Sequence, residues 1–366
     1  MQNTILHFGS YWMGSNDIVN LMQGLLARLP DINVVSFDVQ LYQPTPSPFV
    51  VQDGRVNWIK DETVTELLVR HQPHIVICNA GGLSFTPAMH SALAKQGIVR
   101  VGIALSDPDD FLQRSRHFAK YFDLFYTNAM ESIASYADIG VEVKVLPFAA
   151  DAAFHRPLNI PKKYDVVVVG GMRPERARLV SRLRENGLRV GCFGNGWTTS
   201  EAKRQKAHSV SMPEFARKSL RWLRNRYAIC RLLPIPNRFT EVHGQDHVVA
   251  INSGTVYLSF TQTVAGFTNV KVGLFEAAAC GACVLIHEFS ELHRYFQPGK
   301  EIVTYDTESD AISKARQLCS NTALASQFGV EARKRVLAEH TWEHRWRAVL
   351  ADIHQHRCYK ARKWHL

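Results

Sequence analysis

The residues best suited to chemistry are Lys271 and Glu276, which lie near the start of a predicted helical segment. Ala, Leu and Phe favour this helix, and Gly281 suits the left-handed conformation that ends one. Residues 283–286 are apolar and partly β-branched, which predicts an interior strand after the helix. A helix N-terminus that carries a cation and a carboxylate can bind a phosphate and a ribose. The segment therefore predicts a nucleotide-sugar site that includes Lys271 and Glu276.

A second group of candidate residues follows the valine-rich predicted strand 165–169. Gly170 and Gly171 form a turn that opens a helix, and such a turn presents free backbone N–H groups to a diphosphate. Arg173 and Arg176 could add charge-assisted bonds to phosphate oxygens. The pattern is not G-x-G-x-x-G, which disfavours a nicotinamide dehydrogenase. A Gly-Gly strand end can also be a purely structural turn, so both interpretations stay open.

A third group follows the predicted strand 189–193 and comprises Gly194, Asn195 and Trp197. The glycines around the asparagine predict a tight turn, and the tryptophan offers a flat surface to a base or a sugar. The tryptophan could equally pack into the core. Three further positions complete the expected substrate-binding set: Gly9, directly after the first predicted strand, and Thr268 and Asn269, ahead of Lys271.

The cysteines do not predict a metal site. Seven of them are scattered through the chain, an odd number that suits reduced thiols of a cytosolic protein. Cys280 and Cys283 form a lone C-x-x-C without a second ligand pair at zinc-like spacing, which favours core packing. No Asp-x-Asp pair and no His/Cys cluster is evident in the sequence. We therefore expect no metal and no cofactor besides a nucleotide sugar.

The order of the predicted elements indicates an α/β chain with two successive βαβ series. The predicted strands are residues 5–8, 34–37, 74–79, 99–104, 124–127, 143–146, 165–169, 189–193, 256–260 and 283–286. The predicted helices between and after them are residues 18–29, 63–71, 87–96, 131–139, 174–186 and 332–356. Near-continuous apolar strands are typical of parallel sheets covered on both faces.

These series predict two doubly wound, Rossmann-like domains that face each other across a cleft. The expected boundaries are 1–155 for the acceptor domain, 156–335 for the nucleotide-sugar domain and 336–366 for a C-terminal helix and basic tail. We expect this last segment to pack back on the first domain. Every second residue of the segment 43–48 is a proline, which predicts a loop.

The net charge of +10 is concentrated in residues 203–238 and in the C-terminal tail. An anionic membrane face or a polyanionic glycan would be attracted to this surface, and a merely solvated helix face is the alternative. No nucleic-acid-binding motif accompanies the charge, so no nucleic acid is expected. No apolar run reaches the roughly 20 residues that span a bilayer, and no signal peptide is evident. We expect a cytoplasmic protein, with peripheral contact to the inner membrane face as one use of the basic surface.

Several longer motifs carry a family resemblance. In the second half these are residues 164–171 (YDVVVVGG), 193–197 (FGNGW), 275–282 (FEAAACGA), 296–302 (FQPGKEI) and 340–342 (HTW). In the first half they are residues 105–110 (LSDPDD) and 146–151 (LPFAAD). The chain resembles the CgeB-like, spore-maturation type group of family-4-like GT-B glycosyltransferases. The resemblance implies transfer of a sugar from a nucleotide donor, held mostly by the second domain, to an acceptor held mostly by the first.

The resemblance also implies roles for single residues. Glu276 matches the carboxylate that bonds the donor ribose in this family. The family's cation often lies three places earlier, where this chain has Gly273, and Lys271 is the nearest cation. Retaining relatives carry a glutamate eight places before this carboxylate, where this chain has Thr268.

The implied reaction needs little acid–base machinery. A nucleoside diphosphate leaves as charge builds on its β-phosphate, and Lys271, Arg173 or Arg176 would stabilise that charge without a metal. Asp107 or Asp109 could take the proton of the acceptor hydroxyl, and Asp107 could instead cap the following helix. We expect a retaining, metal-independent hexosyl transfer from a UDP- or GDP-sugar. A catalytically inactive nucleotide-binding protein of the same fold is the alternative, and a sugar-nucleotide epimerase is a weaker one.

Overall fold

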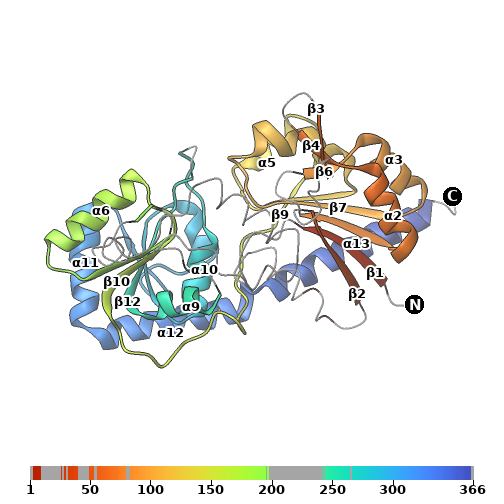
Figure 1. Cartoon of the computed structure of the whole chain (residues 1–366). Helices are drawn as coiled ribbons and strands as arrows, with labels where there is room; N and C mark the ends of the chain where they lie inside the picture. The colour runs from red at the N-terminus through yellow and green to blue at the C-terminus, as the bar shows by residue number, and fades with distance from the viewer. Residues whose placement is uncertain are drawn as a thin grey trace, which may run out of the picture. The chain divides into compact units, whose positions relative to one another are not determined.

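The structure is a computed structural model (Figure 1). It describes residues 3–9, 26, 29, 32–39, 49–52, 56–79, 83–194, 196–197, 242, 244–263 and 266–363. The predicted helix 18–29, the proline-rich loop 43–48 and the basic stretch 203–238 lie outside the described residues, apart from positions 26 and 29. The chain divides into two compact units: residues 1–147 with 342–366, and residues 148–341.

The first unit is built on a parallel sheet of order β2-β1-β5-β7-β8-β9. Its strands are β1 (Asn3–Gly9), β2 (Ile32–Asp38), β5 (Ile75–Asn79), β7 (Val99–Ala104), β8 (Leu124–Thr127) and β9 (Lys144–Val145). The helices that alternate with them are α2 (Asp61–His71), α3 (Pro87–Lys95), η1 (Phe111–Ser115), α4 (Arg116–Phe118), η2 (Ala119–Tyr121) and α5 (Ser132–Ala137). All five residues of β5 are buried, as expected for an interior strand covered on both faces.

The first unit also contains a small sheet that the sequence analysis did not predict. It comprises β3 (Phe49–Gln52), β4 (Val56–Ile59) and β6 (Leu83–Phe85), with β3 antiparallel and β6 parallel to β4. Ile59 and Phe85 are fully buried in the same core as the residues of β1. The rings of Phe8 and Phe85 meet edge to face at 4.9 Å between centroids.

The predicted helix 332–356 is in fact two helices, α12 (Thr322–Glu339) and α13 (Trp342–Lys363). The chain leaves the helical path at His340 and Thr341 because the backbone there pairs with an extended segment. The Ala150 N–H donates to the carbonyl of His340 at 3.1 Å, and Ala150 and Thr341 form a parallel bridge. A helix ends where its backbone groups take other partners.

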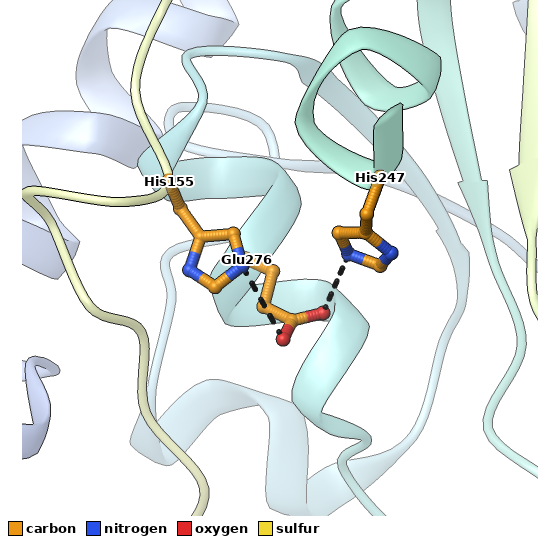
Figure 2. A group of neighbouring side chains, drawn as sticks. All are labelled: His155, His247 and Glu276. Atoms are coloured by element: carbon orange, nitrogen blue, oxygen red, sulfur yellow. Dashed lines mark hydrogen bonds and ion pairs between the residues drawn. The ribbon is translucent and has the colours of Figure 1, made fainter. Parts of the chain in front are cut away.

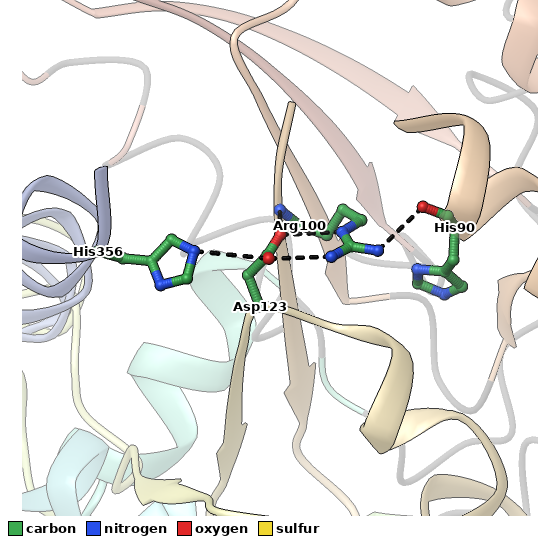
Figure 3. Close-up of polar contacts among 4 residues, drawn as sticks. All are labelled: His90, Arg100, Asp123 and His356. Carbon is green, nitrogen blue, oxygen red and sulfur yellow. Dashed lines mark hydrogen bonds and ion pairs between the residues drawn. The ribbon is translucent and has the colours of Figure 1, made fainter. Parts of the chain in front are cut away.

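Helix α13 belongs to the first unit and packs on its sheet. Trp346 is fully buried and meets the ring of His7 edge-on at 6.3 Å. Arg100 and Asp123 form a bidentate ion pair with contacts of 2.9 Å, and Nε2 of His356 on α13 lies 3.5 Å from Asp123 (Figure 3). No described helix is long and apolar enough to cross a membrane.

The second unit is built on a parallel sheet of order β11-β10-β12-β13-β14. Its strands are β10 (Tyr164–Val169), β11 (Val190–Phe193), β12 (Gly254–Ser259), β13 (Cys283–His287) and β14 (Val303–Tyr305). Its helices are α6 (Pro174–Glu185), α9 (Gln245–Asn252), α10 (Val272–Ala279), η4 (Ser290–Arg294), α11 (Glu308–Ser320) and α12. Helices α6 and α11 cover one face of the sheet, and α9 and α10 lie on the other (Figure 1).

In each parallel sheet, the strands are added first on one side of the opening strand and then on the other. Each unit therefore has a point where the strand order reverses. Strand β10 lies between β11 and β12, and β1 lies between β2 and β5. In doubly wound sheets, ligands bind in the crevice at the carboxyl ends of the two strands that flank such a switch point. In the second unit, this point lies between the carboxyl ends of β10 and β12.

Candidate active site

The turn after β10 is tightly constrained. Gly170 and Gly194 have φ angles of +138° and +140°, which side chains rarely adopt. A Cβ at Gly194 would lie 2.3 Å from the carbonyl oxygen of Gly170. The indole N–H of Trp197 donates to that same oxygen at 2.8 Å, and the Trp197 ring packs against the core of the unit. Trp197 therefore braces the glycine turn; Asn195 lies outside the described residues.

Two guanidinium groups stand beside this turn. Helix α6 begins at Pro174 with Arg173 as its N-cap. Arg176 donates to the carbonyl of Gly171 at 2.9 Å, and its guanidinium lies 5.1 Å above the ring of Phe260. Its buried Nε has no hydrogen-bond partner among the described residues. Burial and the neighbouring Arg173 lower the pKa of Arg176.

Glu175, in the first turn of α6, is a carboxylate that acts on Arg176 without forming an ion pair with it. Arg173 donates to the carbonyl of Gln262 at 3.4 Å, and within the part of the chain that the structure describes neither Arg173 nor Arg176 forms an ion pair. Two adjacent guanidinium groups at the end of a strand and the start of a helix attract an anion, because both the charges and the helix N-terminus favour it. Binding of a phosphate at this turn stays a prediction.

The N-terminus of α10 is only partly as the sequence predicts. Lys271 is the N-cap of α10, whose first helical residue is Val272. The first turn of α10 contains no acidic residue, so the prediction that Glu276 lies near the helix start is wrong. The helix begins only after Lys271, which puts Glu276 in its second turn, where the helix dipole has little effect.

Gly273 has a structural explanation. A Cβ at this position would lie 2.6 Å from the hydroxyl of Tyr257, which is buried on β12. Tyr257 therefore occupies the space that a larger side chain at Gly273 would need. Burial and the charge of Glu276 raise the pKa of Tyr257, and Arg176 lowers it. Both charges thus act on one phenol, which links the turn after β10 with α10.

Glu276 points into a buried pair of histidines (Figure 2). His247 on α9 and His155 ahead of β10 place their Nε2 atoms 3.2 Å from Oε2 and 3.5 Å from Oε1 of Glu276. Glu276 is 4% exposed and His155 is fully buried. Burial alone would raise the pKa of Glu276, but His155 and His247 hold it below its usual value. The two imidazoles therefore oppose the effect of burial on this carboxylate.

The sequence analysis missed both histidines. They come from a connecting segment and from α9, and no local spacing relates either of them to Glu276. The prediction that the chain has no histidine cluster is wrong, because the donor atoms of His155, His247 and Glu276 lie within 4.8 Å of one another. Two imidazoles and a carboxylate are also ligands that zinc accepts.

The other predicted positions near α10 lie in the loop between β12 and the helix. Thr268 is exposed and forms an antiparallel bridge with Gln262, the residue whose carbonyl Arg173 contacts. The backbone N–H of Asn269 donates to Thr261 at 3.1 Å. The side-chain oxygen of Asn269 is buried without a hydrogen-bond partner among the described residues.

Cys280 and Cys283 are buried, and burial raises the pKa of both thiols to about 12.

Two predicted site residues lie in the first unit. Gly9 ends β1 and pairs in register with Asp38 and Asn79, at the carboxyl edge of the sheet. Asp107 is 2% exposed. The structure gives Asp107 an interior position, and it is not a helix cap, because Asp110 is the N-cap of η1.

Three hydroxyl groups bind the carboxylate of Asp107. Ser115 donates at 2.9 Å, Thr127 at 2.9 Å and Tyr136 at 2.6 Å. Burial raises the pKa of Asp107 despite these bonds. This geometry is that of a structural acceptor rather than of a base that is open to a substrate.

The chain was compared with known proteins. Residues 173–351 match the model of a family described as glycosyl transferase-like, and no curated protein matches the sequence significantly. Among solved structures, the sucrose-phosphate synthase of Thermosynechococcus elongatus is 14% identical with a TM-score of 0.59, covering 98% of this chain and 100% of that one. HepE of Anabaena, in complex with UDP, is 10% identical with a TM-score of 0.57, covering 96% and 100%.

A third similar structure is AviGT4, a glycosyltransferase involved in avilamycin A biosynthesis. It is 15% identical with a TM-score of 0.54, and the match covers 97% of this chain and 98% of that one. These likenesses extend over nearly the whole chain, and at such identities they establish the fold. The protein is an α/β chain with the GT-B fold.

Proposed function

We propose that the protein is a glycosyltransferase that takes a hexosyl group from a nucleoside diphosphate sugar. The observation that carries this proposal is the pair of guanidinium groups, Arg173 and Arg176, beside the glycine turn at the switch point of the second unit. Neither forms an ion pair with a described carboxylate, and both flank backbone N–H groups at a helix start. The glycosyl transferase-like match begins at Arg173.

In this proposal, the charge that develops on the leaving diphosphate is stabilised by side chains. Arg173 and Arg176 would contact the phosphates from the turn, and Lys271 would do so from the start of α10. Such contacts act mainly in the transition state, where the charge grows, and they replace a divalent cation. Glu276 would accept hydrogen bonds from the donor ribose. The transfer is proposed to proceed with retention, although Thr268 stands where retaining relatives carry a glutamate.

The donor is proposed to be a UDP-sugar or a GDP-sugar. HepE, which shares the fold, has been crystallised with UDP and with UDP-glucose, so UDP-glucose is the first donor to test. The acceptor is a hydroxyl-bearing glycan, lipid-linked sugar, protein or small molecule. An anionic acceptor or membrane face would suit the net charge of +10.

A second candidate function is nucleotide-sugar binding without transfer. Two departures from the family pattern favour it: Gly273 stands where a cation is common, and Thr268 stands where retaining relatives carry a glutamate. The hydroxyl of Tyr257 leaves no room for a larger residue at Gly273, so the cation cannot be restored there without a shift.

Incubation with a panel of UDP- and GDP-sugars, followed by detection of free nucleoside diphosphate, tests the proposal. Release of UDP or GDP above the rate of the Arg176→Ala variant supports the enzyme. Binding of the sugar nucleotide without release, even with a mixture of candidate acceptors, supports the binding protein. The absence of both binding and release would refute both functions.

A further inference from the structure

The carboxylate of Glu276 is in an unusual position for a charged group. It is 4% exposed, and in the described part of the chain no lysine or arginine forms an ion pair with it. A buried charge is tolerated only when other groups compensate it. The compensating groups here are His155 and His247, one at each carboxylate oxygen (Figure 2).

The histidines are themselves held firmly. The backbone N–H of His155 donates to the carbonyl of Asp151 at 2.7 Å, in a turn that Asp151 caps by accepting from Ala153 at 2.9 Å. His247 lies in the first turn of α9, which packs against β10 and β12. The two rings lie 5.9 Å apart at an interplanar angle of 70°. Two separate elements thus fix the orientation of one carboxylate.

We infer that His155 and His247 are positioning residues, which hold the carboxylate of Glu276 between them and aim it at the ribose of the donor. This inference rests on the proposed function. Each carboxylate oxygen has two lone pairs and can accept more than one hydrogen bond. An imidazole at each oxygen therefore leaves acceptor capacity for a vicinal pair of ribose hydroxyls. The histidines do not touch the ligand in this account; they act through Glu276.

The orphaned nitrogens of His155 agree with such a role. Neither ring nitrogen of His155 forms a hydrogen bond with a described residue, although Nε2 lies within ion-pair distance of Glu276. Burial lowers the pKa of His155, and Glu276 opposes that effect. The ring also contacts the rings of Phe154 and His247, so the carboxylate of Glu276 is its closest charged neighbour rather than its sole neighbour.

The experiment is a cycle between a protein change and a ligand change. UDP and GDP, and their 2′,3′-dideoxy analogues, are titrated into the wild type, His247→Ala and His155→Ala by calorimetry. In the wild type, removal of the ribose hydroxyls should weaken binding by about 10- to 100-fold. In either variant, that penalty should largely vanish, because the carboxylate is no longer aimed at the ribose.

Rescue and control variants separate positioning from a general loss of structure. His247→Gln retains an N–H donor and should restore part of the penalty. His293→Ala removes the partner of Glu288 in an exposed pair of the same unit, with a contact of 2.7 Å, and should bind like the wild type. If the alanine variants do not fold, the glutamine variants at both positions carry the test. In turnover, His247→Gln should raise the donor KM more than it lowers kcat.

Three outcomes would overturn the inference. An undiminished dideoxy penalty in the His155 and His247 variants would show that they do not position Glu276. Stoichiometric zinc in the purified protein, bound through His155 and His247, would make the cluster a metal centre instead. Failure of the wild type to bind either diphosphate would refute the proposed function as well, whereas binding without coupling refutes the positioning alone.

Discussion

Two carboxylates are buried to nearly the same extent, Asp107 in the first unit and Glu276 in the second. Asp107 accepts from three hydroxyl groups, whereas Glu276 faces two imidazole rings. Burial raises the pKa of Asp107, while the histidines hold the pKa of Glu276 low. Burial alone therefore does not mark a functional carboxylate; its partners decide which protonation state is favoured.

The neighbours of the Asp107 and Glu276 carboxylates differ as well. Asp107 lies among aromatic rings, with Phe111 and Tyr136 meeting at 4.8 Å between centroids. Glu276 raises the pKa of Tyr257, and Arg176, the cation beside the glycine turn, lowers it. A carboxylate and a guanidinium group in this arrangement can bind two parts of one nucleotide, the ribose and the phosphate. A carboxylate in an aromatic core cannot. The following predictions test this contrast.

The largest effect is expected at the cation. Arg176→Ala should lower kcat by about 10²–10³, because it removes a contact to the developing charge of the leaving diphosphate. Arg178→Ala is the matched control, since Arg178 lies on the same helix but pairs with Glu308 at 2.6 Å. Steady-state kinetics with varied donor check both. If Arg176→Ala stays active while Lys271→Ala is inactive, the catalytic cation lies at the start of α10 instead.

The next effect concerns Glu276. Glu276→Ala and the isosteric Glu276→Gln should lower kcat/KM by about 100-fold, because a charged acceptor for the ribose is lost. Circular dichroism should show a folded protein in both cases. Glu288→Gln removes the carboxylate of an exposed histidine pair and serves as the control. A Glu276 variant with the wild-type kcat/KM would rule out its assignment.

Asp107→Asn should act on stability and leave the kinetics near those of the wild type. The amide would turn an N–H₂ donor toward one of the three hydroxyl groups, so at least one bond is lost. The free energy of unfolding should fall by about 1–3 kcal/mol. Urea denaturation measures this change. A large loss of kcat with unchanged stability would mean that Asp107 is the acceptor base after all.

The raised pKa of Asp107 also predicts a pH dependence. The folded protein binds this proton more tightly than the unfolded chain, whose value is 3.8, so this group's contribution is present in acid and lost as pH rises through the folded pKa. The charge of Asp110 adds to the rise, and Ser115, Thr127 and Tyr136 oppose it. The stability of the wild type relative to Asp107→Asn should therefore decline with rising pH. A difference that grows with pH would contradict the assignment.

The smallest effect is expected from chelation. Turnover should survive excess EDTA, because the charges of arginine and lysine side chains take the place of a divalent metal ion at the diphosphate. The measurement compares rates before and after chelation and gel filtration. Loss of activity that Mg²⁺, Mn²⁺ or Zn²⁺ restores would show that a metal takes part.

The sequence predicted the parallel sheets well, since their strands are continuous apolar runs such as residues 165–169 and 283–286. It failed where tertiary contacts decide. The helix break at His340 depends on backbone pairing with Ala150, and the small sheet with β3 depends on packing against the core around Phe8. Neither partner is local in the sequence.

The places of the candidate site residues in the fold were likewise predicted only in part. The glycine turn, Arg173 and Arg176 follow directly from strand and helix boundaries, and Lys271 does lie at the start of α10. The environment of Glu276 could not be predicted, because His155 and His247 reach it from distant segments. A sequence pattern gives the chemical type of a side chain, but only the fold gives the partners that set its charge.

The most direct test of the central claim is calorimetric titration of UDP and GDP into the wild type and into an Arg173→Ala, Arg176→Ala double variant. The account predicts that at least one diphosphate binds the wild type and that its binding is lost, by about 100-fold or more, in the double variant. The Arg178→Ala control should bind like the wild type. Equal binding of the diphosphate by the wild type and the double variant would contradict the account.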